Sequence, residues 1–234
     1  MRKLATAIGL SLAILLVVPL ASETVVSYHR RYEASKLLAV VRRLRPAVTT
    51  QTQAQEQLKS FSRFEQVSDL RREGVAIHEL DYEFLNGTNW SDSLAYHLRF
   101  VPFRLTLPWT RFVVNLEFVN GMLAEIDVGE MQVDQPGYLH PNGASVLIVS
   151  SQLGALPGNP WGSLDAGFNG YYEHSQQTAG LDEKGNFNGF TCCYERFIRL
   201  DDRASERQFS QSLNFQLRCL TSFLRCKNDR EILP

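Results

Sequence analysis

The feature that most constrains this chain is a long uncharged stretch near its N-terminus. Residues 4–22 contain no Asp, Glu, Lys or Arg and directly follow Arg2 and Lys3. A helix of about 19 such residues is long enough to cross the hydrocarbon core of a bilayer. We therefore expect residues 1–22 to form a signal anchor or a signal peptide. The remainder, roughly 200 residues, is enough for one domain with a hydrophobic core or for two small ones.

The same stretch decides the expected localisation. Cleavage after Ala21 would place Pro19 three residues before the cut, where signal peptides carry a small residue, so we favour retention as an anchor. Basic residues flank both ends of the stretch, which leaves the positive-inside rule nearly neutral. Because the four cysteines cluster near the C-terminus, we expect a single-pass membrane protein whose C-terminal domain is extracytoplasmic. If the stretch is cleaved, the protein is secreted or periplasmic.

Charge divides the chain into a basic neck and an acidic head. Residues 1–23 carry +1 and residues 24–45 carry +5, which leaves −7 for residues 46–234 within the total of −1. An acidic head without a dense Lys/Arg run is poorly suited to binding nucleic acid, so we exclude nucleic acid as a partner. The pattern indicates three parts, namely residues 1–22, a basic juxtamembrane helix at 23–46 and an extracytoplasmic domain at 47–234.

The neck has the spacing of a helix that ends near Pro46. Its apolar residues recur at intervals of three to five, at Tyr28, Tyr32, Leu37, Val41 and Leu44. Between them lie Arg30, Arg31, Arg42 and Arg43. These arginines would attract anionic lipid headgroups by about 1 kcal/mol each if they lie at the membrane surface. A solvated helix face packed on the head is the equally weighted alternative.

After Gly74 the apolar spacing changes to two, which predicts strands. Residues 80–84 alternate between apolar and acidic side chains, residues 94–100 supply the partner of a hairpin, and a third strand begins at Phe112. We predict an α+β fold with an N-terminal membrane or signal helix. An antiparallel β-meander of four or five strands follows between residues 77 and 151, with a C-terminal helix packed on it.

The turn at Asn120 and Gly121 is the point where the hydrophobic pattern fixes a register. A plain two-residue loop would place Leu116 opposite Glu125 and mix the two faces of the sheet. One bulged residue restores matching faces, for example with Leu116 opposite Ala124. We therefore predict a type I turn with Gly121 as a left-handed bulge rather than a type I′ turn.

Two capping signals predict helix starts outside the meander. Thr50 with Gln53, and Ser205 with Gln208, have the spacing of a capping box. In the second case, the predicted C-terminal helix carries a buried stripe made of Phe209, Leu213, Leu217 and Leu220.

The cysteines lie in the last part of the chain, at Cys192, Cys193, Cys219 and Cys226. In an oxidising compartment they are expected to pair. A local link between Cys219 and Cys226 is favoured, because the first ends the predicted helix and the second follows a turn. Links from the vicinal pair to each of these two cysteines are the alternative. The chain lacks Cys-x2-Cys knuckles, so we predict no metal site.

The sequence offers no complete catalytic set and no cofactor motif. A phosphate-binding glycine loop and a nucleophile elbow are both missing, and His78-Glu79 lacks the second histidine of a zinc-protease helix. Glu79, Asp81 and Glu83 follow the polar side of one predicted strand. They supply the carboxylates of a hydrolase in one interpretation and a solvated sheet face in the simpler one.

The most site-like segment is aromatic and rich in glycine. Its candidate binding residues are Trp161, Phe168, Tyr171, Tyr172, Phe187 and Phe190. Aromatic faces beside Asn amides would form a groove for a peptide or a glycan. Alternatively, these residues are strand ends and turns that pack the edge of the sheet.

The C-terminal block resembles the end of a group of uncharacterised bacterial single-span envelope proteins. It runs from Asn214-Phe215-Gln216-Leu217-Arg218-Cys219 through Cys226 to Glu231-Ile232-Leu233-Pro234. Those proteins also open with a hydrophobic segment and a basic helix. The resemblance implies a location in the cell envelope and carries over no functional residue.

Together these features favour a non-enzymatic function. We expect a membrane-anchored extracytoplasmic domain that binds or scaffolds envelope components, with a protein or a glycan as its partner and the bilayer contacted through residues 4–22. The alternative is an envelope hydrolase that uses the strand carboxylates, with the aromatic loops as its groove.

Overall fold

The computed structural model describes residues 2–72, 74–86, 109–134, 145–154, 170–174, 180–181, 187–188, 191–200, 204–221, 224 and 226–234. Helix α1 (Arg2–Val41) is followed by α2 (Gln51–Leu58) and a 3₁₀ turn, η1 (Lys59–Phe64). The main sheet contains β1 (Glu65–Arg72), β2 (Val75–Asn86), β3 (Trp109–Val119), β4 (Met122–Asp134), β5 (Ser145–Gly154), β6 (Gly170–His174) and β9 (Thr191–Leu200). The described elements end with α4 (Glu206–Ser212), η3 (Arg218–Leu220) and η4 (Asp229–Glu231).

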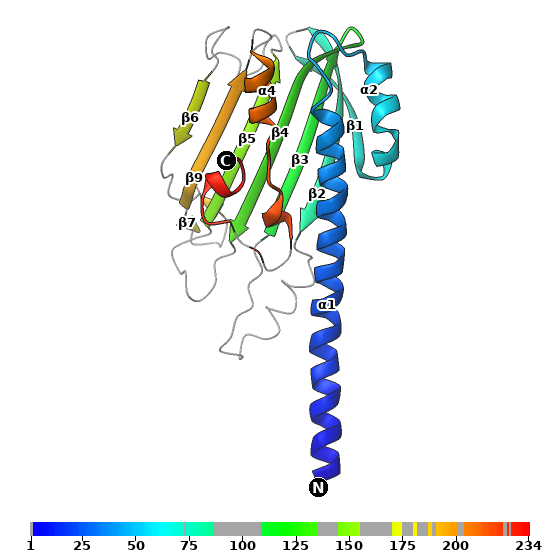
Figure 1. Cartoon of the computed structure of the whole chain (residues 1–234), viewed down its shortest axis with the longest axis vertical. Coiled ribbons are helices and arrows are strands. Elements are labelled where there is room, and N and C mark those ends of the chain that lie inside the picture. Colours follow the sequence, from blue (N-terminus) through cyan, green and yellow to red (C-terminus); the bar gives the residue numbers. More distant parts are fainter. Residues whose placement is uncertain are drawn as a thin grey trace.

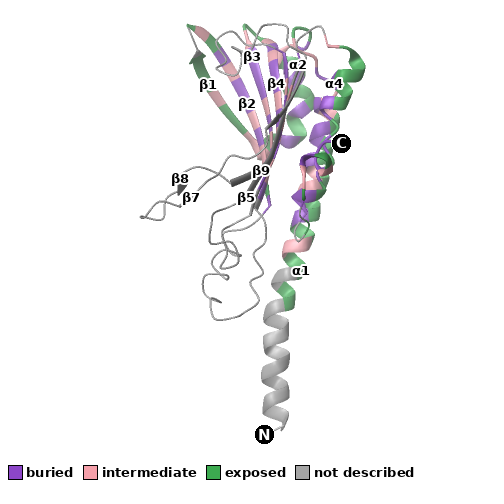
Figure 2. Cartoon of the chain, turned by 90° about the vertical axis from the view of Figure 1, so that its left-hand side faces the viewer, coloured by how far each residue is buried: buried purple, intermediate pink, exposed green. Residues whose placement is uncertain are grey.

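The fold is α+β, as predicted, and its centre is an antiparallel meander. Strands β1 to β5 pair consecutively and antiparallel. The helices and the C-terminal segment cover one face of this sheet (Figures 1 and 2). We call this the inner face and the opposite one the outer face. The predicted strand at residues 94–100 lies outside the described residues.

The sheet is larger than the sequence predicted. It begins with β1, before the expected first strand, and continues beyond β5, which pairs in parallel with β9. Strand β6 then pairs antiparallel with β9. A separate pair is formed by β7 (Gly180–Leu181) and β8 (Phe187–Asn188). The parallel pair joins segments far apart in the sequence, which local periodicity cannot reveal.

The predicted β3–β4 turn was wrong. Asn120 and Gly121 both have positive φ, 50° and 77°, in a two-residue loop that pairs Val119 with Met122, which is a type I′ turn. A bulge is present, but it lies farther along, so that Leu116 faces Ile126. The turn is held from outside the hairpin, because the Gln51 amide donates to the Gly121 carbonyl at 2.8 Å and Leu123 exchanges bonds with the 47–49 backbone.

Helix α1 carries two groups of apolar residues. Leu37, Val41 and Leu44, which follows the helix, are fully buried against the sheet. Tyr28 and Tyr32 are 55% and 59% exposed. At about 100° per residue, the two groups lie on opposite sides of the helix.

The C-terminal region differs from the predicted long helix. Both capping boxes are confirmed, but α4 ends at Ser212 and Leu217 adopts a left-handed conformation with φ 51°. Leu213, Leu217 and Leu220 are still buried in the core, in an irregular segment rather than along one helix. Cys219 and Cys226 form the expected disulfide.

The segment is fastened to the inner face at its disulfide. Gln132 of β4 donates to the Cys226 carbonyl at 3.2 Å and accepts from the Cys226 amide at 2.9 Å. Arg42 of the α1 end donates to the Leu213 carbonyl at 2.9 Å. Within the described part of the chain, no helix is both long and apolar enough to cross a membrane.

Candidate functional site

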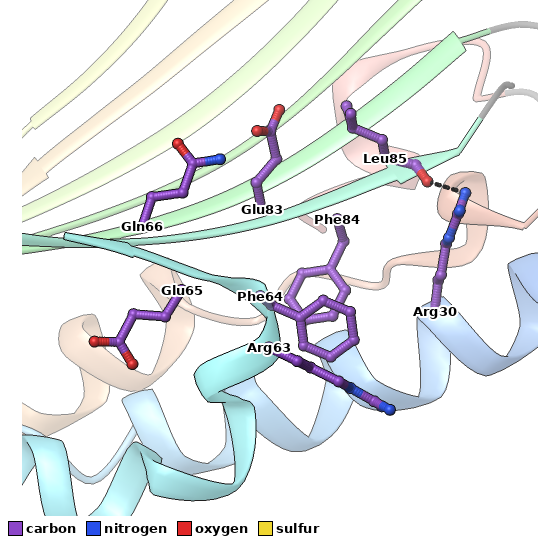
Figure 3. A pocket seen from close by; sticks show the side chains of 8 residues that line it. All are labelled: Arg30, Arg63, Phe64, Glu65, Gln66, Glu83, Phe84 and Leu85. Carbon is purple, nitrogen blue, oxygen red and sulfur yellow. Dashed lines mark hydrogen bonds between the residues drawn. The ribbon is translucent and has the colours of Figure 1, made fainter. Parts of the chain in front are cut away.

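A cleft of about 350 Å³ lies where α1 passes the start of β1 and the end of β2 (Figure 3). Phe64 and Phe84 stack beneath it, with ring centroids 4.4 Å apart. Gln66 and Glu83 project on the opposite side of the two strands (Figure 3). The cleft therefore combines an aromatic wall with polar groups, which suits a ligand having both an apolar and a polar part.

Two arginines line this cleft. Arg30 of α1 donates to the Leu85 carbonyl at 2.5 Å. Arg63 of η1 lies 4.5 Å from the centroid of Phe64 and 3.4 Å from a carboxylate oxygen of Glu33. Within the described part of the chain no carboxylate forms an ion pair with Arg30, so its guanidinium keeps further donors for an anionic group.

A buried acid lies on the inner face of β4. Glu130 is 1% exposed, and neither of its carboxylate oxygens has a hydrogen-bond partner among the described residues. Burial raises the pKa of Glu130 to about 8, and the Arg31 charge opposes this shift. The carboxyl is therefore mostly protonated at neutral pH. Its burial leaves no path for a substrate, which argues against a catalytic role.

The outer face collects carboxylates from three neighbouring strands. They are Glu79, Asp81 and Glu83 of β2, Glu117 of β3, and Glu125 and Asp127 of β4. The register places Glu79, Glu117 and Glu125 in one row, while Asn115 separates Asp81 from Asp127 in the next. The strand carboxylates that the sequence singled out therefore belong to a wider acidic face.

Donors on the same face hold several of these groups. Ser68 donates to Glu79 at 2.6 Å, and Asn115 donates to the other Glu79 oxygen. Gln152 donates to Glu125 at 2.5 Å, and Ser150 donates to Asp127 at 2.8 Å. Bonds of this kind fix the carboxylates in place.

Two carboxyl groups on the outer face have raised pKa values. Burial, reinforced by the Glu79 charge, raises the pKa of Asp81 to about 6. Burial also raises the pKa of Asp127 to about 6, against the hydrogen bond from Ser150. No group of three His, Cys, Asp or Glu suited to a metal ion occurs among the described residues.

The aromatic residues predicted from the sequence lie away from this cleft or outside the description. Tyr171 and Tyr172 belong to edge strand β6, and Phe187 belongs to the small pair β7–β8. Trp161, Phe168 and Phe190 lie outside the described residues. The groove they were predicted to form is thus neither assembled nor excluded by the described chain.

Sequence reasoning missed Phe64, Arg63 and Glu130. Phe64 and Arg63 follow a short helix without a periodic signal, and they reach the cleft only because η1 turns the chain into β1. Glu130 did carry a signal. It continues the inner-face alternation of Ile126 and Val128, where a carboxylate is out of place.

Comparison with known proteins gave no match to a family model, to a curated protein or to a solved structure.

Proposed function

We propose that this chain is a membrane-anchored protein of the cell envelope whose extracytoplasmic head binds or scaffolds other envelope components. Residues 4–22 would cross the bilayer, and the head would lie on the outer side. The observation that carries the proposal is the division of α1. Its core residues begin at Ala34, and its N-terminal half projects away from the head (Figure 1).

The disulfide supports an oxidising compartment. Cys219 and Cys226 are bonded, and both are buried. Disulfides are rare in cytosolic proteins, where thiols are kept reduced. The cleft supports a binding role, because it offers an aromatic wall and the Arg30 charge without an accessible catalytic set among the described residues.

The anchor is tested by extraction from membranes. Full-length protein in a bacterial host should stay with the membrane pellet after alkaline carbonate washing. A variant lacking residues 2–22 should appear in the soluble fraction. Its disulfide should form only if another export signal replaces the removed segment. Recovery of the full-length protein in the cytosol would overturn the proposal.

The geometry of α1 refines the proposed contact with anionic headgroups. At 1.5 Å per residue, Arg30 and Arg31 lie about 12 Å beyond Ser22, whereas Arg42 and Arg43 lie about 30 Å beyond it. Headgroup layers extend about 6 Å past the hydrocarbon core, and their negative surface potential falls off within a further Debye length of about 8 Å. The attraction to lipid would therefore fall mainly to Arg30 and Arg31.

A hydrolase is the second candidate, favoured by the carboxylates gathered on the outer face. Asp81 and Asp127 have pKa values raised to about 6, a range useful for acid/base work near neutral pH. The test is turnover of a panel of chromogenic ester, peptide and glycoside substrates. Hydrolysis that both Asp81→Asn and Asp127→Asn abolish would support an enzyme, and no turnover above buffer would reject it.

A further inference from the structure

The cleft beside α1 is also the place where strand β2 extends past its neighbour β1. Strand β1 begins at Glu65, which lies opposite Tyr82, whereas β2 continues to Asn86. Beyond Tyr82, β2 pairs only with β3 among the described strands. Residues 83–86, roughly 13 Å of strand at about 3.3 Å per residue, therefore have an open edge, and most of them line the cleft.

The backbone groups on this open edge follow from the alternation of a strand. The N–H and C=O of one residue point to the same edge, and those of the next residue point to the other. Arg30 binds the Leu85 carbonyl in the cleft, so the Leu85 amide and, two residues earlier, the Glu83 carbonyl point there too. The β3–β4 turn gives the same assignment. Val119 closes it, and Arg111, eight residues earlier and opposite Leu85, therefore also bonds toward β4.

The side chains around the open edge suit an apolar residue close to an acidic one. Phe84 points to the inner face, where its ring lies 4.4 Å from that of Phe64. A residue added opposite Phe84 would rest on this aromatic wall. The next residue on the same face would lie opposite Asn86, on the side of Arg30, whose remaining N–H donors favour a carboxylate.

The acidic side chains that line the cleft already have partners. The Glu83 carboxylate lies on the outer face and pairs with Arg111 at 2.5 Å. Glu65 accepts a bond from the Tyr82 hydroxyl at 3.3 Å and lies at the end of the cleft away from Arg30 (Figure 3). Neither carboxylate therefore occupies the place beside Arg30 where an anionic group would bind.

We propose that the cleft binds an extended peptide segment of a partner protein, which adds to the open edge of β2 and runs antiparallel to it. One residue of the segment donates its N–H to the Glu83 carbonyl, and the residue two positions earlier accepts from the Leu85 amide. An apolar residue between them rests on Phe64 and Phe84. An acidic residue two positions before the apolar one binds Arg30.

This inference rests on the binding role proposed above for the cleft and names the class of partner. A polypeptide strand carries N–H and C=O groups at the spacing of a strand edge, whereas a lipid headgroup or a glycan does not. The anchor is tested separately by membrane extraction. Failure of peptide binding in a protein that stays in the membrane pellet would therefore reject this inference alone.

A short peptide with the inferred order of groups serves as the probe. It has the sequence Gly-Glu-Thr-Leu-Thr, with a fluorescent N-terminus and an amidated C-terminus, and its anisotropy is measured against full-length protein in phosphatidylcholine nanodiscs. Saturable binding is expected. Replacing the glutamate of the probe by glutamine should lower the affinity about five-fold, and replacing its leucine by serine should lower it about ten-fold.

Methylation of the peptide backbone tests the strand pairing without changing the protein. The N–H of the last threonine is the donor to the Glu83 carbonyl, so its N-methylation should lower the affinity about ten-fold. The matched control is N-methylation of the leucine, whose N–H points away from β2 and whose modification should cost less than about two-fold. Equal losses for the two methylated probes would overturn the proposed pairing.

Two measurements on the protein complete the test. In Arg30→Gln the glutamate and glutamine probes should bind equally, whereas Arg71→Gln, exposed at the far end of β1, should keep the five-fold difference. The Leu85 amide should exchange rapidly in the free protein and become protected when the probe binds. Absence of saturable binding, a five-fold difference that persists in Arg30→Gln, or a Leu85 amide already protected in the free protein would overturn the proposal.

Discussion

Both sides of α1 carry apolar residues, but only one side is covered by the head. Leu37 and Val41 are fully buried on the sheet, while Tyr28 and Tyr32, a few residues earlier, are more than half exposed. Only the buried side contributes to the core of the head. The comparison teaches that apolar spacing along a helix shows how much surface needs a partner, while the tertiary fold decides which part finds it within the same chain.

The largest expected effect separates the two sides directly. Leu37→Ala should lower the free energy of unfolding by about 2–5 kcal/mol, because a fully buried leucine leaves a cavity. Tyr32→Ala should change it by less than about 0.5 kcal/mol, because this side chain is 59% exposed. Urea unfolding of the full chain in detergent, followed by tryptophan fluorescence, measures both. Similar losses for both variants would break the comparison.

The second prediction concerns the acid beneath the buried side of α1. Folding raises the pKa of Glu130 from 4.5 to about 8, so the folded state holds this proton more tightly than the unfolded state. Stability should therefore be full below pH 4.5 and should fall as the pH rises to 8, by at most about 1.4 kcal/mol per pH unit. The total loss is on the order of 5 kcal/mol.

Thermal melting between pH 6 and 8 isolates the effect of Glu130. Asp81 and Asp127 also lower the stability as the pH rises, but their pKa values are raised only to about 6. Glu130→Gln should be more stable than the unmodified protein at pH 8 and should lose most of the slope. An unchanged slope in Glu130→Gln would show that this carboxyl is already ionised in the fold.

The elements that sequence reasoning predicted well are those fixed by neighbouring residues. Both capping boxes formed, and the strands through Tyr82 and Val114 follow their alternation. The failures depend on partners distant in sequence. The 47–51 backbone fixes the Asn120 turn, and Thr221 lies 190 residues from the Arg31 that it contacts. The cleft was missed for the same reason, since its lining comes from α1, η1 and two strands.

The third prediction concerns the C-terminal segment, which packs beside the buried side of α1. Reduction of the Cys219–Cys226 bond should cost about 2 kcal/mol, at the low end because the closed loop is short. Hydrogen exchange should show residues 227–234 losing protection before the meander does. The Gln132 contacts with Cys226 should persist. Global unfolding on reduction would show that the segment is part of the sheet's cooperative unit.

The smallest effect compares two levels of the exposed helix surface. Arg30→Gln with Arg31→Gln should weaken binding to phosphatidylglycerol vesicles in cosedimentation by less than about 2 kcal/mol, because each charge contributes at most about 1 kcal/mol near the surface and less with distance from it. The control is Arg43→Gln, exposed just beyond the end of α1 and about 30 Å from Ser22, which should bind normally. Equal losses would place the whole neck on the membrane surface and would contradict an upright α1.

The central claim is that α1 anchors a head lying outside the cytoplasm, and labelling of unlysed spheroplasts tests it most directly. A cysteine at Val48, a residue 70% exposed just beyond α1, would be treated with a membrane-impermeant maleimide. The matched background replaces Cys192 and Cys193 with Ser. The account predicts full labelling of Val48→Cys in spheroplasts before lysis. Labelling that appears only after lysis would place the head in the cytoplasm and contradict the account.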